Sequence, residues 1–295
     1  MWDNYGEIIR YEIDGSIKNI VVKYINPDKL VNSNKFNKNV SHNRKIKSYN
    51  IEINWYKYYN YLCNDECYTP KMYYGNSSSK EKILILEDLF YSGFNNTSKN
   101  YNISQINILL KWLANFHGIF IHDKANNLWE NGSYWHLSTR LEELNLIKDE
   151  NIRKQSYKID EALNNAKYKT IIHGDAKIDN FLFNKNKTKV AAFDFQYVGK
   201  SIGMKDVIYL LDSFLPQDII KKNESYILNI YFQELKLALE KYNKNIDFDE
   251  LESEWRSLYT FAFADFYRFL LGWAPCYAKS SSYIGEIFRN TINKI

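Results

Sequence analysis

The first part of the chain has the alternating apolar and polar pattern of β-strands. Residues 8–13 partly alternate, and residues 20–25 are apolar and mostly β-branched, so we predict two strands joined by a turn at Asp14-Gly15-Ser16. A polar stretch from about residue 26 to 50 predicts an irregular connection. A short apolar run at residues 82–86 predicts another buried strand, so this part is rich in sheet.

Most of the remaining chain has the helical spacing of large apolar residues. We predict helices at residues 51–62, 103–122, 161–167, 223–242 and 251–273. A strand pair near residues 181–193 interrupts them. The pattern therefore predicts an α+β fold in two parts, with a small sheet-rich part at residues 1–88 and a larger helical part at residues 89–295.

Composition and charge narrow the classes of function. Hydrophobic residues make up 45% and charged residues 25% of the 295 residues, which are globular values and exclude disorder. The net charge of +4 is too mild to predict nucleic acid or an anionic membrane as a partner. The 3 cysteines form no paired motif that would predict a disulfide framework or a zinc site.

Neither a signal peptide nor a membrane span is predicted. The start of the chain lacks the basic and apolar regions of a signal peptide. The most apolar run, residues 260–278, carries Asp265 and Arg268 and is better explained as a buried helix. We therefore expect a cytoplasmic protein.

The strongest chemical signal is the segment His173-Gly174-Asp175-Ala176-Lys177, followed by Asn180 and, after a predicted hairpin, by Asp194. A tight loop can direct Asp175 and Asn180 to one point, and the hairpin returns Asp194 to the same place. Two carboxylates and one carboxamide are hard oxygen ligands that suit Mg²⁺ shared with substrate phosphates. A base, a divalent ion and a cation are what phosphoryl transfer requires, and the order resembles the kinase catalytic loop and metal-binding motif.

The front part supplies the remaining parts of a kinase site. Lys23 lies near the end of an apolar strand, where a kinase has its phosphate-contacting lysine, and Glu52 lies on the next helix, where it can pair with Lys23. The segment Leu86-Glu87-Asp88-Leu89 corresponds to the linker whose backbone meets the adenine edge. Taken singly, Lys23 and Glu52 are equally well explained as solvated surface charges.

Six segments resemble the ecdysteroid-kinase-like branch of the aminoglycoside phosphotransferase/choline kinase superfamily: Asn4–Ile8, Leu86–Leu89, Gly132–Leu137, His173–Asn180, Val190–Gly199 and Gly203–Val207. The resemblance covers nearly the whole chain. It implies a bilobed protein-kinase-like fold with an N-lobe and a C-lobe. It also implies an enzyme that moves the γ-phosphate of ATP to a hydroxyl group of a small-molecule acceptor.

The resemblance also implies roles for single residues. Asp175 would be the catalytic base with Lys177 near the transferred phosphate, Asn180 and Asp194 would bind Mg²⁺, and ATP would meet Lys23 with its partner Glu52, Gly6, Glu87 and Leu89. Gly6 is the only glycine in the expected phosphate-covering loop, and the chain begins only a few residues before it. We therefore expect an N-lobe truncated at its N-terminus, with a short roof over the nucleotide.

Two other classes of protein compete with a small-molecule kinase. A protein kinase needs an activation segment, but only 12 residues lead from Asp194 to Asp206 and no Ala-Pro-Glu follows. A catalytically impaired kinase-like binding module fits the short front end, whereas the complete set of site residues opposes it. No sequence feature predicts the oligomeric state.

Candidate acceptor contacts lie in the helical part. They are Trp135, His136 and Arg140 in one loop and Asp265, Arg268 and Trp273 along a late helix. An intrahelical Asp–Arg pair with core aromatic residues explains the helix equally well. An aromatic pocket suits a quaternary ammonium or a sterol-like ring system, and the basic C-terminal tail makes aminoglycosides less favoured.

Two further polar residues are predicted to be structural. Asp206 opens an apolar helix, where it would cap the helix and, by the resemblance, hold the catalytic-loop backbone. His117 lies on an apolar helix and is predicted to be a hydrogen-bonded structural histidine.

Overall fold

The computed structural model describes residues 6–26, 38–97 and 103–294. Its contacts divide the chain into two compact units. The first unit contains residues 1–98 and 179–197, and the second contains residues 99–178 and 198–295. Of the segments that carry the family resemblance, Asn4 and Tyr5 lie outside the described residues.

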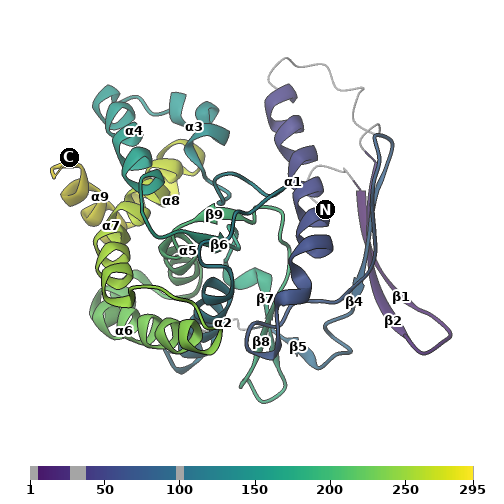
Figure 1. Ribbon diagram of the computed structural model, residues 1–295. Coiled ribbons are helices and arrows are strands. Elements are labelled where there is room, and N and C mark those ends of the chain that lie inside the picture. The colour runs from purple at the N-terminus through teal and green to yellow at the C-terminus, as the bar shows by residue number, and fades with distance from the viewer. Residues whose placement is uncertain (1–5, 27–37, 98–102, 295) are drawn as a thin grey trace. The chain divides into compact units, whose positions relative to one another are not determined.

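The first unit is built on an antiparallel sheet of four strands in the order β1-β2-β4-β3 (Figure 1). The strands are β1 (Gly6–Glu12), β2 (Asn19–Ile25), β3 (Met72–Ser77) and β4 (Lys82–Glu87). Lys23 lies opposite Ile8 of β1 and Leu84 of β4 in the sheet register. The predicted strands near residues 8–13, 20–25 and 82–86 are therefore confirmed, whereas the partly exposed β3 was not predicted.

Helix α1 (Lys38–Tyr58) packs against β3 and β4 of this sheet. The predicted irregular connection is wrong for residues 38–50, because the helix begins at Lys38. Its first half is dominated by lysine and asparagine, which hide the helical pattern. Tyr49 nevertheless packs with Ile25 of β2 and Ile46 of α1, so one face of this polar segment is buried.

A second sheet in the first unit joins segments that are far apart in the sequence. β5 (Phe94–Asn96) pairs with β7 (Phe181–Asn184), and β7 pairs with β8 (Val190–Ala192). Leu89, Phe94 and Ala191 form a small core beneath them. The division of the structure therefore differs from the predicted boundary after residue 88, because residues 89–98 and the hairpin at 179–197 pack with the first unit.

The second unit is mainly helical. Its helices are α2 (Ile103–Phe120), α3 (Leu141–Asn145), α4 (Glu150–Asn164), α5 (Met204–Phe214), α6 (Gln217–Lys241), α7 (Phe248–Trp273), α8 (Pro275–Ser280) and α9 (Ser282–Ile292), and its strands β6 (Thr170–Ile172) and β9 (Gly199–Ser201) form a pair. α2 packs along α6, and α7 contacts α4, α5 and α9. The predicted α+β fold, with one sheet-rich and one helical unit, is confirmed.

Aspartate side chains cap the starts of two of these helices. Asp149 and Asp247 accept backbone N–H groups at the starts of α4 and α7. Such caps satisfy donors that the first turn of a helix leaves free. Within the described ranges, no helix combines the length and apolar character that crossing a bilayer would need.

Candidate active site

The loop after β6 is fixed by the buried carboxylate of Asp206 on α5. Its oxygens accept the backbone N–H groups of His173, at 2.6 Å, and Gly174, at 2.9 Å. The ring of His117 lies 3.1 Å from the same carboxylate and 2.8 Å from the hydroxyl of Tyr231. His117 is therefore the hydrogen-bonded structural histidine that was predicted. Asp206 holds the loop backbone as predicted, but it does not cap α5, whose N-cap is Gly203.

Two further residues of α5 form hydrogen bonds to the same loop. The Tyr209 hydroxyl bonds to Asp175, and burial together with the Asp175 charge raises the pKa of Tyr209. The Ser213 hydroxyl accepts the backbone N–H of Ile178 at 2.9 Å. Residues 206, 209 and 213 lie on one helical face, so α5 serves as a straight support for the loop that carries Asp175.

Asp175 itself is 5% exposed and lies beside Lys177. The Lys177 ammonium is 3.5 Å from the Asp175 carboxylate, and the Lys177 backbone N–H donates to the Asp175 carbonyl at 2.8 Å. The Lys177 side chain is one-third exposed, so its charge reaches solvent while Asp175 stays buried. This pairing places a cation next to the predicted base.

In the first unit, Lys23 is held between two carboxylates. Its ammonium lies 2.5 Å from Glu52 of α1 and 3.2 Å from Asp194. Burial lowers the pKa of Lys23, but the charges of Asp194 and Glu52 outweigh it, so the net shift is upward and the ammonium stays charged. The predicted Lys23–Glu52 pair is confirmed, and the link to Asp194 joins β2 to the segment after β8.

Gln196 completes this cluster from the same segment as Asp194. Its side chain bonds to Glu52 and accepts the Ser48 hydroxyl at 3.2 Å. Phe195, between Asp194 and Gln196, stacks on Trp55 with ring centroids 4.7 Å apart. The Asp194-Phe195-Gln196 segment is therefore anchored on α1 through Phe195 and Gln196, and on β2 through Asp194.

Asn180 and Asp194 have the chemistry of a magnesium site. The Phe193 N–H donates to the Asn180 carbonyl at 3.0 Å, which brings the two residues onto neighbouring backbone. Asp194 has a φ of 69°, a left-handed conformation that aspartate tolerates better than most residues. One carboxylate and one carboxamide oxygen fit a hard divalent ion that takes further oxygens from phosphates and water.

The three predicted acidic and amide residues belong to different units. Asn180 and Asp194 lie in the first unit and Asp175 lies in the second. Among the described residues, no group of three His, Cys, Asp or Glu side chains has the arrangement of a metal site. The meeting of Asp175 with Asn180 and Asp194 therefore stays a prediction.

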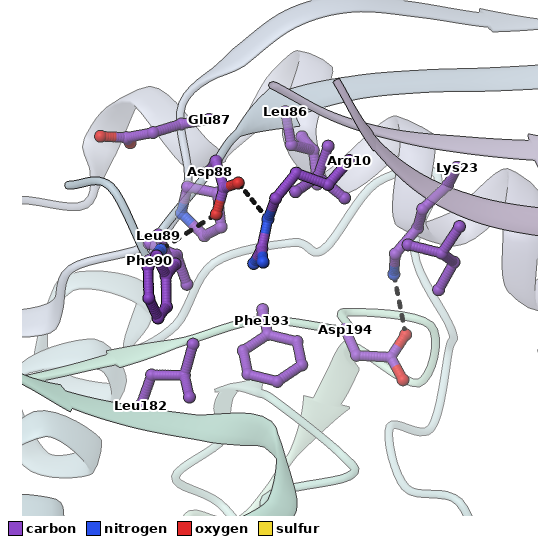
Figure 2. Close-up of a pocket in the computed structure, with 13 residues that line it drawn as sticks. Arg10, Lys23, Leu86, Glu87, Asp88, Leu89, Phe90, Leu182, Phe193 and Asp194 are labelled. Atoms are coloured by element: carbon purple, nitrogen blue, oxygen red, sulfur yellow. Dashed lines mark hydrogen bonds and ion pairs between the residues drawn. The ribbon is translucent and has the colours of Figure 1, made fainter. Parts of the chain in front are cut away.

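An apolar pocket of about 250 Å³ lies in the first unit next to the Lys23–Asp194 pair (Figure 2). Its walls are mostly aliphatic and aromatic side chains, with Glu87 and Asp88 toward one end, Lys23 and Asp194 toward the other, and Arg10 between them. It is lined by Ile8, Arg10, Val21, Lys23, Pro70, Leu86, Glu87, Asp88, Leu89, Phe90, Leu182, Phe193 and Asp194. A flat apolar group fits such walls, with a charged tail near Lys23.

The linker after β4 is pinned by the carboxylate of Glu87. That carboxylate accepts the Tyr68 hydroxyl at 2.7 Å, the Ser92 hydroxyl at 2.5 Å and the Lys71 backbone N–H at 3.0 Å. The Leu89 carbonyl accepts the Phe94 N–H at 2.9 Å, whereas the Leu89 N–H has no acceptor in the part of the chain that the structure describes. The Glu87 side chain thus shapes the linker and leaves a donor at the pocket wall.

Gly6 lies in β1, opposite Ile25, and not in a loop. A Cβ atom at this position would stand 1.9 Å from the Tyr24 carbonyl oxygen, so the close approach of the two strands requires glycine. This strand pairing explains Gly6 without a phosphate ligand. Its predicted contact with nucleotide remains a prediction.

A family model described as "Ecdysteroid kinase-like family" matches residues 16–130 and 130–244. The chain belongs to the ecdysteroid kinase-like family. The resemblance found in the sequence motifs is therefore confirmed. A comparison with curated protein sequences gave no match.

Solved structures similar to this ecdysteroid kinase-like protein are small-molecule kinases by their titles. A Plasmodium vivax ethanolamine kinase is 12% identical and matches with a TM-score of 0.48 over 98% of this chain and 82% of its own. A putative fructosamine-3-kinase from Haemophilus somnus is 16% identical, with a TM-score of 0.45 over 98% and 92%. An aminoglycoside phosphotransferase from Streptomyces rimosus, in complex with ADP and streptomycin, is 9% identical, with a TM-score of 0.44 over 81% and 86%.

Most of the predicted acceptor contacts of this ecdysteroid kinase-like protein are buried in a charged cluster. Asp265 forms ion pairs with Lys205, at 3.0 Å, and with Arg268 of its own helix. Arg268 also donates to the Trp135 carbonyl at 2.9 Å. The intrahelical Asp–Arg pair that the sequence offered as an alternative is thus present, and it anchors α7 to the loop with Trp135.

The other candidates differ in exposure. His136 is buried with its ring 3.4 Å from Asp160, and Arg140 stacks on Tyr134 at 4.0 Å and donates to the Tyr134 carbonyl. Trp273 is 49% exposed. Trp273 is therefore the member of this set with surface available to a ligand, and a contact between any of them and an acceptor stays a prediction.

Sequence reasoning missed several residues of this site. Tyr209 and Ser213 lie at helical spacing from Asp206, and that spacing was the available signal for the support of the loop. Gln196 follows Asp194 by two residues, but its bond to Glu52 depends on tertiary packing. Arg10 on β1 and Asp88 on the linker also line the pocket, and no local pattern connects them.

Proposed function

We propose that this chain is an ATP-dependent phosphotransferase that moves the γ-phosphate to a hydroxyl group of a small-molecule acceptor. The observation that carries the proposal is the charged Lys23, held by Glu52 and Asp194 at one end of an apolar pocket. The apolar walls suit a nucleobase and the free Leu89 N–H suits its edge. Lys23 then stands where a phosphate tail needs a cation.

Mg²⁺ would be held by Asp194 and Asn180 and would neutralise phosphate oxygens in the transferring group. Glu52 keeps the Lys23 ammonium charged and directed at the same place. Phe195 and Gln196 fix the backbone that follows Asp194, so Asp194 would lose little freedom when it binds the ion. The protein would therefore hold the Lys23 and Asp194 charges in position before the phosphate arrives.

Asp175 would accept the proton of the acceptor hydroxyl. The rigid loop supports this role, because Asp206 holds its backbone and Tyr209 its side chain. Lys177, 3.5 Å from Asp175, supplies a positive charge that favours an ionised base and can steady the incoming phosphoryl oxygens.

The short segment between Asp194 and Asp206 favours a small acceptor. β9 and the start of α5 occupy the residues from Gly199 to Asp206, which leaves no long segment there to form a peptide platform. The partner would therefore be a hydroxylated small molecule and not a protein segment. Its chemical identity is a matter for screening.

A thermal-shift measurement with Mg-ATP, followed by an ADP-release screen of hydroxylated small molecules, tests the proposal. A ligand that binds only the folded protein raises the melting temperature by mass action. Asp194→Asn should abolish metal-dependent turnover while the protein stays folded. Asp175→Asn should keep nucleotide binding and lose transfer, because the base acts on the acceptor.

Two results would count against the proposal. Unchanged, normally metal-dependent turnover in Asp194→Asn would remove the metal assignment. The absence of any thermal shift at millimolar nucleotide would instead favour a kinase-like binding module without catalysis.

A further inference from the structure

The pocket holds a second charged pair, in which Arg10 of β1, above Phe193, meets Asp88 of the linker on the side away from Lys23 (Figure 2). The Asp88 side chain is only 1% exposed, whereas that of Arg10 is 54% exposed. The other Asp88 oxygen accepts the Phe90 N–H at 3.0 Å. The buried Asp88 carboxylate thus holds the Arg10 guanidinium by one edge, while the rest of the Arg10 side chain stays accessible.

The free side of Arg10 faces the pocket. Its Nε is the atom that meets Asp88, and Figure 2 shows the other two nitrogens directed into the space between the linker and Phe193. The guanidinium carbon lies 5.2 Å from the centre of the Phe90 ring. Among the described residues, no acceptor for these two nitrogens is found.

A planar cation between the apolar walls of this pocket can serve few kinds of ligand group. Phosphates are better served by Lys23 at one end of the pocket, beside the candidate metal ligands. Leu182 and Phe193 form the wall opposite Arg10. A flat guanidinium that faces such a wall leaves a slot suited to an aromatic ring, on which arginine stacks by cation–π attraction.

We propose that Arg10, fixed by Asp88, covers one face of the nucleobase in this pocket and so contributes to recognition of the base and not of the phosphates. The proposal rests on the nucleotide-binding function proposed above. Asp88 is then a positioning residue, because it acts by holding the guanidinium in the plane of the slot.

Isothermal titration calorimetry with Mg-ATP and with magnesium tripolyphosphate, which has no base, tests this role. Arg10→Met should weaken ATP binding by about 2- to 30-fold, the range of a cation–π contact, and leave tripolyphosphate binding unchanged. Arg10→Lys should recover little, because lysine lacks the flat group. Arg44→Met on α1, outside the pocket, is the matched control.

The partner residue gives a second, independent measurement. Asp88→Asn keeps an acceptor for the Phe90 N–H but releases Arg10, so it should weaken ATP binding with little effect on tripolyphosphate. The double variant should be no weaker than Arg10→Met, since both changes remove one interaction.

Several outcomes would overturn the inference while leaving the proposed function intact. These are tighter or unchanged ATP binding in Arg10→Met, an equal loss for ATP and tripolyphosphate, or fully additive losses in the double variant. Wild-type protein that binds tripolyphosphate but not ATP would also overturn it. Wild-type protein that binds neither ligand would refute the nucleotide-binding function itself, and the role of Arg10 with it.

Discussion

Replacing Asp206 with asparagine should destabilise the second unit strongly. The carboxylate is fully buried and meets three groups, the backbone N–H of His173, that of Gly174 and the ring of His117. The amide oxygen of asparagine can replace the Asp206 oxygen that serves both His173 and His117, but its N–H₂ group then faces the Gly174 N–H. At least one contact is lost, worth about 1.5–3 kcal/mol for a charged acceptor, so the free energy of unfolding should fall by about 1.5–3 kcal/mol or more.

Urea unfolding followed by tryptophan fluorescence measures this loss. With an m value of about 3 kcal/mol per molar of urea, the midpoint should fall by at least about 0.5 M. Trp255 and Trp135 are buried in the same unit and report on it. Asp247→Ala, which removes only the cap of α7, is a graded control and should cost about 1 kcal/mol.

A loss below about 1 kcal/mol in Asp206→Asn would refute the reasoning. It would mean that the loop backbone finds other acceptors at little cost. The view of α5 as the support of the Asp175 loop would then have to be abandoned.

Two further predictions concern the second unit. Burial, helped by Lys205, lowers the pKa of His136 to about 3, so below pH 6.5 the unfolded chain binds a proton that the folded chain excludes. The free energy of unfolding should therefore fall between pH 6.5 and 4 by up to about 1.4 kcal/mol per pH unit. In urea titrations His136→Asn should flatten this pH dependence. Equal pH dependence in the variant and the wild type would contradict the role given to His136. Gly272→Ala should destabilise by about 1–3 kcal/mol or more, because its Cβ would lie 2.0 Å from the Glu143 carbonyl oxygen. Calorimetric melting should show a clear fall for Gly272→Ala and a small one for Gly285→Ala, whose nearest neighbour is a tyrosine hydroxyl at 3.2 Å; equal falls would contradict the steric argument.

The sequence predicted the parts of the site that depend on local pattern. Lys23 stands out as a charge in an apolar strand, and the order of Asp175, Asn180 and Asp194 follows a known arrangement. The pairing of Lys23 with Glu52 followed from that arrangement and is confirmed at 2.5 Å. Asp206 was singled out by its place at the start of an apolar helix, although its carboxylate serves the neighbouring loop and not its own helix.

The features that were missed depend on tertiary packing. The first half of α1 is so polar that only its contact with Ile25 reveals a buried face. β3 is an edge strand with tyrosines partly exposed on it, so its side chains do not alternate clearly. The pairing of β5 with β7 joins residues too distant for any local signal, which is why residues 179–197 were assigned to the helical part.

The discontinuity of the first unit has a consequence for how the protein is made. As the nascent chain leaves the ribosome, β1 to β5 emerge first, but β7, β8 and Phe195 follow only after α2 to α4 have been synthesised. Until then Trp55 lacks its stacking contact with Phe195, and β5 lacks its neighbour β7. The segment from β1 to β5 therefore keeps apolar surface exposed until the β7–β8 hairpin has been synthesised. A chaperone that covers exposed apolar surface would be most useful during this interval.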